Sequence, residues 1–218
     1  MPLNPDLAAY LELVDSGRRS GKALPMHQLH PEQARQQFDQ SSALMDPCAD
    51  EPEFIQPLSL TARDGQRLQA RWYRPPAWDA SQLSGAVLYL HGGGYVVGSL
   101  DSHDALCWNL ALDSGLPVLS LQYRLAPQWR FPTAFNDAED AWQWLALNAR
   151  ELGIDPERLA VVGDSVGASL ATVLASSLAA QHALPQPRLQ VLIYPVTDAS
   201  RASASVERYG VGHLLEKD

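Results

Sequence analysis

Long apolar runs are missing from this chain of 218 residues. No window approaches the roughly 18 uninterrupted apolar residues that a membrane-spanning helix needs, so we expect no membrane association. The first residues, Met1 to Asp6, contain neither the basic segment nor the apolar segment of a secretion signal. These two absences predict a cytoplasmic protein.

Basic residues are scarce relative to acidic ones. The chain has 16 Lys and Arg against 25 Asp and Glu, which gives a net charge of -9. A surface of this sign repels phosphate backbones, and no basic stripe with interleaved aromatic residues is present. Nucleic acid is therefore not an expected partner.

Cysteine is nearly absent as well, with only Cys48 and Cys107. The two residues lie in unrelated contexts, without C-x-x-C spacing or a histidine-rich neighbourhood. The sequence therefore predicts neither a metal site nor a disulfide framework. We expect two inert thiols, because free cysteines tend to be buried.

The chain length favours a single layered core rather than two comparable domains. Residues 1–55 nevertheless differ in pattern, with two polar helical stretches at residues 5–16 and 31–44. Their thin apolar faces indicate helices that lie on another part of the protein. We therefore expect N-terminal helices over residues 1–55 and the main layered unit over residues 56–218.

The pattern from residue 55 onward predicts a sheet. Short alternating runs at residues 58–62 and 68–73 are joined through Asp64-Gly65, which indicates an antiparallel hairpin. Continuous apolar runs, typical of parallel strands buried on both faces, follow at residues 86–90, 117–121, 159–163 and 189–194. Helical patterns lie between them at residues 101–114, 135–152 and 165–182. This alternation predicts an α/β fold with a mostly parallel central sheet flanked by helices.

A G-x-S-x-G motif follows the apolar run at residues 159–163. It consists of Gly163, Asp164, Ser165, Val166 and Gly167. The motif alone has little weight, but here it lies between an apolar strand and an Ala-rich helix, as a nucleophilic serine requires. The glycines relieve crowding at a sharp turn, and the helix directs the positive end of its dipole to the same place. We identify Ser165 as a candidate catalytic nucleophile, with a plain helix N-cap as the alternative.

A second glycine-rich segment follows the run at residues 86–90. It consists of His91, Gly92, Gly93 and Gly94. Glycines leave backbone N–H groups open, so Gly93 and Gly94, together with Val166, are expected to form an oxyanion hole. A phosphate cradle is the alternative, although neither G-x-G-x-x-G nor a following Lys-Ser/Thr pair is present. We interpret His91 as a residue that holds the loop, because a base in this chain order follows its acid.

These two motifs do not stand alone. Y-R-L-A-P occurs at residues 123–127, F-P-T-A at 131–134, an acidic pair at 139–140 and L-I-Y-P at 192–195. With them the chain resembles the hormone-sensitive-lipase-like serine esterases, which are bacterial family IV of the α/β-hydrolase superfamily. The resemblance implies an α/β-hydrolase fold and hydrolysis of small-molecule carboxylic esters with short or medium acyl chains. It also implies that the helices of residues 1–55 contribute to a lid, and that no metal or organic cofactor is needed.

The chain departs from the family pattern near both motifs. Gln128 stands where the family usually has Glu, Val166 replaces Ala, and Ala168 with Ser169 replaces Gly-Asn. Val166 keeps its backbone N–H, so the set of expected oxyanion donors is unchanged.

The acid and the histidine of a triad are the missing part. The resemblance implies that both lie beyond Asp218 together with two further strands. We therefore expect a C-terminally truncated chain that has little or no activity in isolation. Asp198 and His213, joined by a polar linker over residues 199–208, have the right chain order and remain an alternative dyad. If the last two strands are absent, the run at 189–194 leaves an unpaired apolar edge. Such an edge favours aggregation or pairing, including formation of a homo-oligomer.

A small-molecule-binding protein is the rival function. Some members of the resembling family have given up their histidine and act as receptors. The intact serine motif and H-G-G-G loop favour the esterase, because a receptor has less need of them.

Overall fold

The computed structural model of the chain describes residues 3–21, 24–47, 53–200 and 203–215. The chain forms two units, one of residues 1–34 with 197–218 and one of residues 35–196. Helix α2 (Pro31–Met45) is divided between them after Ala34. The boundary at residue 55 and the lid role of residues 1–55 stay predictions, and Cys48 lies outside the described residues.

The smaller unit is helical where the structure describes it. It contains α1 (Pro5–Arg19), the short 3-10 helix η1 (Met26–Gln28), the start of α2, and α6 (Ala204–Tyr209). The side chain of Asn4 caps α1 by accepting a hydrogen bond from the Asp6 N–H at 2.8 Å. Helix α6 corrects the expected linker at residues 199–208, where the Ser203 hydroxyl provides an N-cap that accepts from the Val206 N–H.

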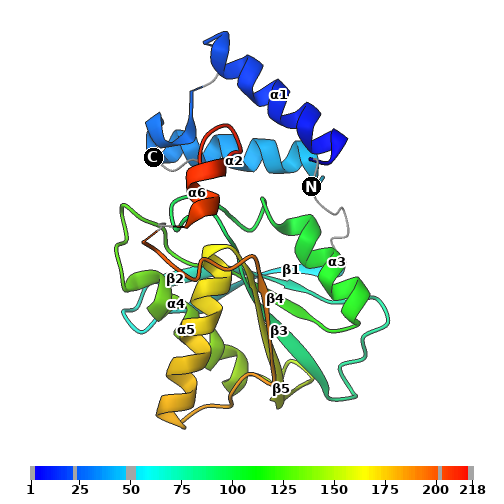
Figure 1. Cartoon of the computed structure of the whole chain (residues 1–218). Helices are drawn as coiled ribbons and strands as arrows, with labels where there is room; N and C mark the ends of the chain where they lie inside the picture. The colour runs from blue at the N-terminus through cyan, green and yellow to red at the C-terminus, as the bar shows by residue number, and fades with distance from the viewer. Residues whose placement is uncertain (1–2, 22–23, 48–52, 201–202, 216–218) are drawn as a thin grey trace. The chain divides into compact units, whose positions relative to one another are not determined.

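The larger unit is built on a six-stranded sheet with the order β1-β2-β4-β3-β5-β6. The strands are β1 (Ile55–Thr61), β2 (Arg67–Tyr73), β3 (Ser84–Leu90), β4 (Val118–Gln122), β5 (Ile154–Asp164) and β6 (Leu189–Ile193). The pairs β1-β2 and β2-β4 are antiparallel, whereas β4-β3, β3-β5 and β5-β6 are parallel. The predicted α/β fold with a mostly parallel sheet is thereby confirmed (Figure 1).

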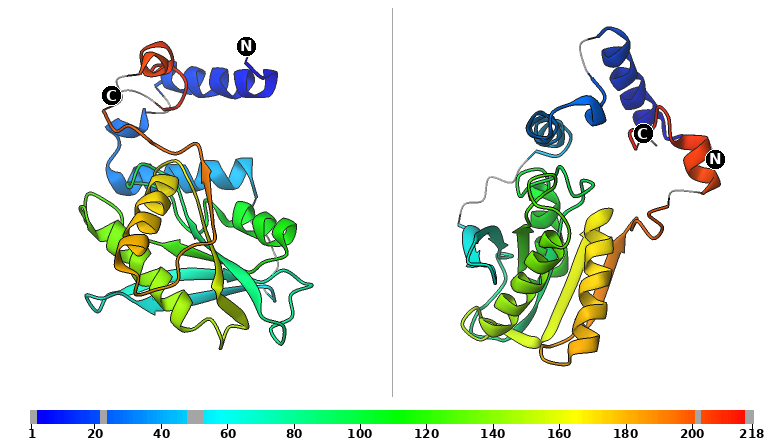
Figure 2. Two further views of the ribbon diagram at one scale, coloured as in Figure 1. Left: turned by 60° about the horizontal axis from the view of Figure 1, so that its bottom comes forward. Right: turned by 90° about the vertical axis from the view of Figure 1, so that its left-hand side faces the viewer.

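Helices cover both faces of this sheet. In one apolar cluster, side chains from strands β2, β3, β4 and β5 pack against two helices, α4 (Thr133–Leu147) and α5 (Val166–Gln181). A second cluster joins the alternate side chains of the same strands to α3 (Asp104–Ser114). Figures 1 and 2 show α4 and α5 on one side of the strands and α3 on the other. The alternation of side chains along each strand thus supplies two separate cores.

Strand β6 differs from the expectation of a strand buried on both faces. Leu189 is 58% exposed, and Val191 and Leu192 are 39% and 37% exposed. The reason is its place in the sheet, because β6 pairs with β5 alone among the described strands. The expected apolar edge is therefore present.

The sheet also fixes where the two glycine-rich motifs meet. Strands β3 and β5 are parallel neighbours, and Leu90 at the end of β3 is in register with Gly163 near the end of β5. Segments that follow the carboxyl ends of adjacent parallel strands lie side by side. The H-G-G-G loop and the serine motif consequently share one edge of the sheet.

Candidate active site

Ser165 occupies the turn between a strand and a helix. Strand β5 ends at Asp164 and α5 begins at Val166, and Ser165 between them has φ 52° and ψ -122°. A positive φ is strained for a residue with a side chain, and such strain clusters at functional sites. The Ser165 N–H donates to the Ile193 carbonyl of β6 at 2.9 Å. Its side chain makes no capping hydrogen bond to α5, which counts against the plain N-cap alternative.

The first turn of α5 lies against the end of β3. A Cβ added to Gly167 would lie 2.1 Å from the Leu90 carbonyl oxygen and 2.5 Å from that of His91. A Cβ on Gly163 would lie 2.5 Å from the backbone carbon of Gly167. Only glycine permits backbones to approach this closely. The G-x-S-x-G glycines thus bring the serine turn into direct backbone contact with the strand that leads to the H-G-G-G loop.

The loop after β3 holds a tight turn with open amides. The Gly93 carbonyl accepts from the N–H groups of Val96 at 3.0 Å and Val97 at 2.9 Å. Gly93 has φ 114°, and a Cβ there would meet the Val97 carbonyl oxygen at 2.2 Å. Among the described residues the N–H groups of Gly93 and Gly94 have no hydrogen-bond partner. They are therefore free to donate to an oxygen of a ligand.

Asp164 ties the loop to the strands below the serine. It is buried, with 6% of its surface exposed. Its Oδ1 accepts from the Tyr89 hydroxyl at 2.7 Å and from the Gly92 N–H at 2.8 Å, and His103 Nε2 lies 3.4 Å away. Burial by itself raises the pKa of Asp164. The hydrogen bond and the charge of His103, together with the hydrogen bonds from Tyr89 and Gly92, outweigh burial, so the pKa of Asp164 is lower than its usual value. Asp164 is thus a carboxylate at neutral pH.

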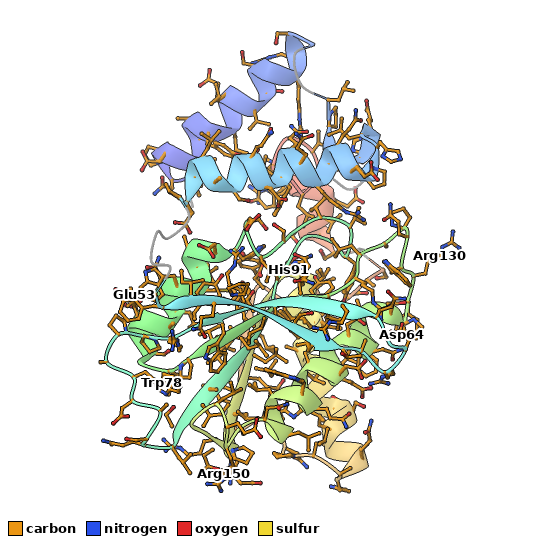
Figure 3. The ribbon with its side chains drawn as sticks, turned by 180° about the vertical axis from the view of Figure 1, so that it is seen from behind. Glu53, Asp64, Trp78, His91, Arg130 and Arg150 are labelled. Carbon is orange, nitrogen blue, oxygen red and sulfur yellow. The ribbon has the colours of Figure 1, made fainter. Side chains whose placement is uncertain are left out.

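His91 is fully buried at the end of the strands (Figure 3). Its Nδ1 lies 2.7 Å from the Gly92 carbonyl, which can only accept, so Nδ1 carries the proton. Its ring stacks on Tyr123 at 4.2 Å between centroids, and the Tyr123 hydroxyl donates to the His91 carbonyl at 2.6 Å. Burial, with the neighbouring His103, lowers the pKa of His91 to about 4. A neutral ring packed in this way supports the interpretation of His91 as a residue that holds the loop.

The predicted site residues all lie in the larger unit. The structure brings them to one edge of the sheet: His91, Gly92, Gly93, Gly94, Gly163, Asp164, Ser165, Val166 and Gly167. The Tyr95 hydroxyl adds a bond between the two motifs, because it donates to the Val166 carbonyl at 3.2 Å.

Tyr89 and His103 are the members of this arrangement that the sequence pattern missed. Tyr89 lies within a run that reads simply as a buried strand, and its hydroxyl is the one signal that it needed a polar partner. His103 lies 61 residues from Asp164 in the chain and carries no local signal. Only the fold brings its ring 5.5 Å from that of His91, between centroids.

The histidines that follow Ser165 in the chain do not form the alternative dyad. Asp198 is exposed and accepts from the Ser200 N–H at 2.8 Å, whereas His213 Nδ1 lies 2.9 Å from the Val211 carbonyl. No hydrogen bond joins Asp198 to His213 in the part of the chain that the structure describes. His182 follows the last residue of α5, so the helix rise alone places it about 24 Å from the serine turn.

Other polar residues of the family-like motifs have structural partners. Arg124 donates to both carboxylate oxygens of Asp137 and, at 2.6 Å, to Asp64. Arg63 pairs with Glu139 at 2.9 Å and with Asp140 at 2.7 Å.

Burial raises the pKa of the Cys107 thiol, which agrees with the expectation of an inert thiol for this residue.

Asp164→Asn tests the arrangement below the serine. We expect the variant to lose about 1–3 kcal/mol of unfolding free energy at pH 7, because a buried carboxylate that accepts two hydrogen bonds is replaced by an amide. The folded state lowers the pKa of Asp164, so its charge stabilises the fold above the unfolded value of about 3.9, and this contribution is lost as the pH falls through the lowered pKa. Urea unfolding at pH 7 and at pH 3 measures the difference between variant and parent, which should shrink at the lower pH. Asp113→Asn, at an exposed position, is the control. If Asp164→Asn lost the same unfolding free energy at both pH values, the charge of Asp164 would not stabilise the fold.

Comparison with known proteins agrees with this geometry. The family model described as the alpha/beta hydrolase fold matches residues 87–218. Ethyl acetate hydrolase of Pseudomonas putida is 66% identical over 216 residues, which cover 99% of this chain and 68% of that protein. The carboxylic ester hydrolase LipN of Mycobacterium tuberculosis is 42% identical over 164 residues, which cover 73% of this chain and 43% of that protein.

Solved structures give the same result. An ester hydrolase from the metagenome of Lake Arreo, solved with a derivative of bipyridine phosphonate, has a TM-score of 0.89 and 34% identity. The match covers 99% of this chain and 67% of that one. The hyperthermophilic esterase of the archaeon Pyrobaculum calidifontis has a TM-score of 0.84 and 34% identity, over 99% of this chain and 66% of that one. The chain thus spans about two thirds of these structures, and it belongs to the alpha/beta hydrolase family, in the hormone-sensitive-lipase-like group of carboxylic ester hydrolases that its motifs indicate.

Proposed function

We propose that this chain carries the nucleophile and the oxyanion hole of a serine esterase acting on small esters of short or medium acyl chains. Ser165 Oγ attacks the carbonyl carbon of the ester, and the alcohol leaves as an acyl-enzyme forms. Water then attacks the acyl-enzyme and releases the carboxylic acid. The name of the Pseudomonas putida relative supports ethyl esters of short acids as the first substrates to try.

The observation that carries the proposal is the pair of open amides beside the strained serine. The N–H groups of Gly93 and Gly94, with that of Val166 at the start of α5, are proposed to donate to the negative oxygen of the tetrahedral intermediate. Each such donor contributes about 3 kcal/mol to lowering the barrier in enzymes where one has been removed. The positive end of the α5 dipole acts on the same oxygen.

We propose that the general base and its acid come from residues outside the 218 described by this sequence. A serine hydroxyl is a weak nucleophile at neutral pH without a histidine that takes its proton. No dyad forms among the described residues after Ser165, and about one third of the Pseudomonas putida relative lies outside the match, which covers 68% of that protein. Nothing in the described residues favours the small-molecule receptor as a second function.

The experiment compares two proteins on ethyl acetate and p-nitrophenyl acetate. One is the chain of 218 residues, and the other, called the extended chain, continues with the C-terminal third of the Pseudomonas putida ethyl acetate hydrolase. We expect the extended chain to turn over both esters, and residues 1–218 alone to be slower by at least about 10³-fold, because they lack the base. Equal turnover by the two proteins would contradict the proposal that the base lies elsewhere.

Location and assembly remain predictions. No helix in the described residues is long and apolar enough to cross a membrane. We propose a cytoplasmic location and assembly into a homo-oligomer, and a size-exclusion measurement of the mass in solution tests the assembly.

A further inference from the structure

A pocket of about 420 Å³ lies in the larger unit, between α2, the start of β2 and the segment after β4. Three arginines and one aspartate line it: Arg35, Arg67, Arg124 and Asp39. Such a surplus of positive charge is unexpected in a chain whose net charge is -9. The pocket is therefore a candidate site for an anion.

Among the residues that the structure describes, Arg35 has only neutral partners. Its Nε donates to the Val96 carbonyl at 2.8 Å, and one Nη donates to the Ala126 carbonyl at 2.8 Å and to Gln128 Oε1 at 2.7 Å. No carboxylate lies within 4 Å of its guanidinium in the described part of the chain. Three acceptors therefore orient the group without neutralising it.

Arg67 likewise donates to neutral acceptors and not to a carboxylate among the described residues. Its Nε donates to the Ser59 hydroxyl at 3.0 Å and one Nη to the Thr61 hydroxyl at 3.3 Å, and it forms no ion pair among the described residues. Asp39 accepts from the Ser99 hydroxyl at 2.7 Å and is paired with neither arginine. The pocket thus holds two guanidinium groups without a carboxylate partner against one carboxylate.

Arg124 shows what a neutralised arginine looks like in this protein. It binds the carboxylates of Asp137 and Asp64, and its guanidinium carbon lies 4.6 Å from the ring centroid of Trp129. Arg124 therefore lines the pocket, but its charge is already neutralised by two carboxylates and we do not expect it to bind the anion.

Gln128 explains why Arg35 lacks a counter-ion. The amide oxygen of Gln128 accepts from Arg35 at 2.7 Å, and a glutamate at this position has the same length and would place a carboxylate oxygen there. The amide keeps the hydrogen bond and omits the charge. A bound anion would gain charge-assisted hydrogen bonds there, which are about twice as strong as neutral ones.

Apolar groups complete the pocket. Leu68 and Leu125 line it with only 1% and 8% of their surfaces exposed, and Trp129, which also lines it, is 42% exposed. A carboxylate head with a short apolar body fits this combination better than an inorganic ion does, because the body can cover the exposed surface of Trp129 and the small exposed part of Leu125. We propose that this pocket binds a small organic carboxylate, with the head on Arg35 and Arg67 and the apolar body against Leu125 and Trp129.

The experiment is a calorimetric titration of the chain with sodium butyrate at constant ionic strength. We expect saturable binding of butyrate, no saturable binding of sodium chloride, and weaker binding of inorganic phosphate. Loss of one charge-assisted contact in Arg35→Gln should weaken butyrate binding by about tenfold or more. Arg150→Gln is the matched control and should bind as the parent does, since Arg150 lies at the end of the strands opposite His91 (Figure 3).

A second variant keeps the test decisive if Arg35→Gln folds poorly. Gln128→Glu supplies an internal carboxylate to Arg35, so it should fold at least as well as the parent and still lose butyrate binding. Butyrate binding that is absent in the parent, that chloride or phosphate matches, or that survives in Gln128→Glu would overturn the proposal. The measurement follows binding and not turnover, so its outcome is independent of the proposed esterase function.

Discussion

Ser165→Ala in the extended chain is expected to lower kcat for p-nitrophenyl acetate by about 10⁴- to 10⁶-fold, the range found when a catalytic serine is removed. The physical reason is that the oxyanion donors and the binding contacts remain, while the atom that forms the acyl-enzyme is lost. The backbone of the turn should persist, because the Ser165 N–H bond to Ile193 does not involve the side chain. Steady-state rates with parent and variant, at equal folded concentration, provide the measurement.

Ser169→Ala is the matched control for this substitution. Ser169 is on the same helix, one turn later, and its hydroxyl donates to the Val196 carbonyl at 2.8 Å. We expect its removal to change kcat by less than about tenfold, the effect of one neutral hydrogen bond. A Ser165→Ala variant that keeps kcat within that same factor of the parent would show that another group is the nucleophile.

Trp142→Ala is expected to cost about 3–5 kcal/mol of unfolding free energy, as large-to-small substitutions of buried aromatic residues do. Trp142 on α4 is fully buried, and its Nε1 donates to the Pro185 carbonyl at 2.8 Å. It therefore packs α4 into the same core as α5, whose first turn carries the serine. Chemical denaturation of residues 1–218 measures the loss.

Two further variants separate the parts of this effect. Trp142→Phe keeps most of the buried ring and loses the bond to Pro185, so about 1 kcal/mol should be lost. Trp144→Ala, on the half-buried side of the same helix, should cost less than Trp142→Ala. Equal losses for Trp142→Ala and Trp144→Ala would contradict the placement of Trp142 at the centre of this core.

The sheet could be predicted because its signals are local. The Asp64-Gly65 turn and the alternation on either side specify the β1-β2 hairpin, in which Gly65 takes φ 84° and the Ala62 N–H bonds the Gln66 carbonyl. The apolar runs of β3, β4 and β5 are long enough to be read without any partner. Ser165 could be located for the same reason, since strand, turn and helix are contiguous.

Contacts between distant segments could not be predicted. Asp164 meets Tyr89 and Gly92, which are more than 70 residues earlier in the chain, and only the pairing of β3 with β5 brings them together. The exposure of β6 depends on its place at the sheet edge, which its apolar run does not reveal. Helix α6 is six residues long, too short for its pattern to stand out from a polar linker.

The neutral surroundings of Arg35 also depend on contacts between distant segments, so they could not be predicted from the sequence. Its partners Val96 and Ala126 are backbone carbonyls, and any residue type can supply a carbonyl. The Gln128 departure could be noticed in the sequence, but its meaning depends on the 2.7 Å contact with Arg35. A sequence pattern records the change of residue and not the loss of a counter-ion.

The most direct test of Ser165 as the nucleophile is covalent capture by a p-nitrophenyl alkylphosphonate. In this reaction the serine Oγ forms a bond to phosphorus as p-nitrophenolate leaves, so the adduct marks the attacking atom. The extended chain is treated with the reagent, digested and analysed by mass spectrometry. We expect one phosphonylated peptide, with the modification on Ser165 and no adduct in the Ser165→Ala variant. An adduct on another residue, or labelling that is unchanged in Ser165→Ala, would contradict this expectation.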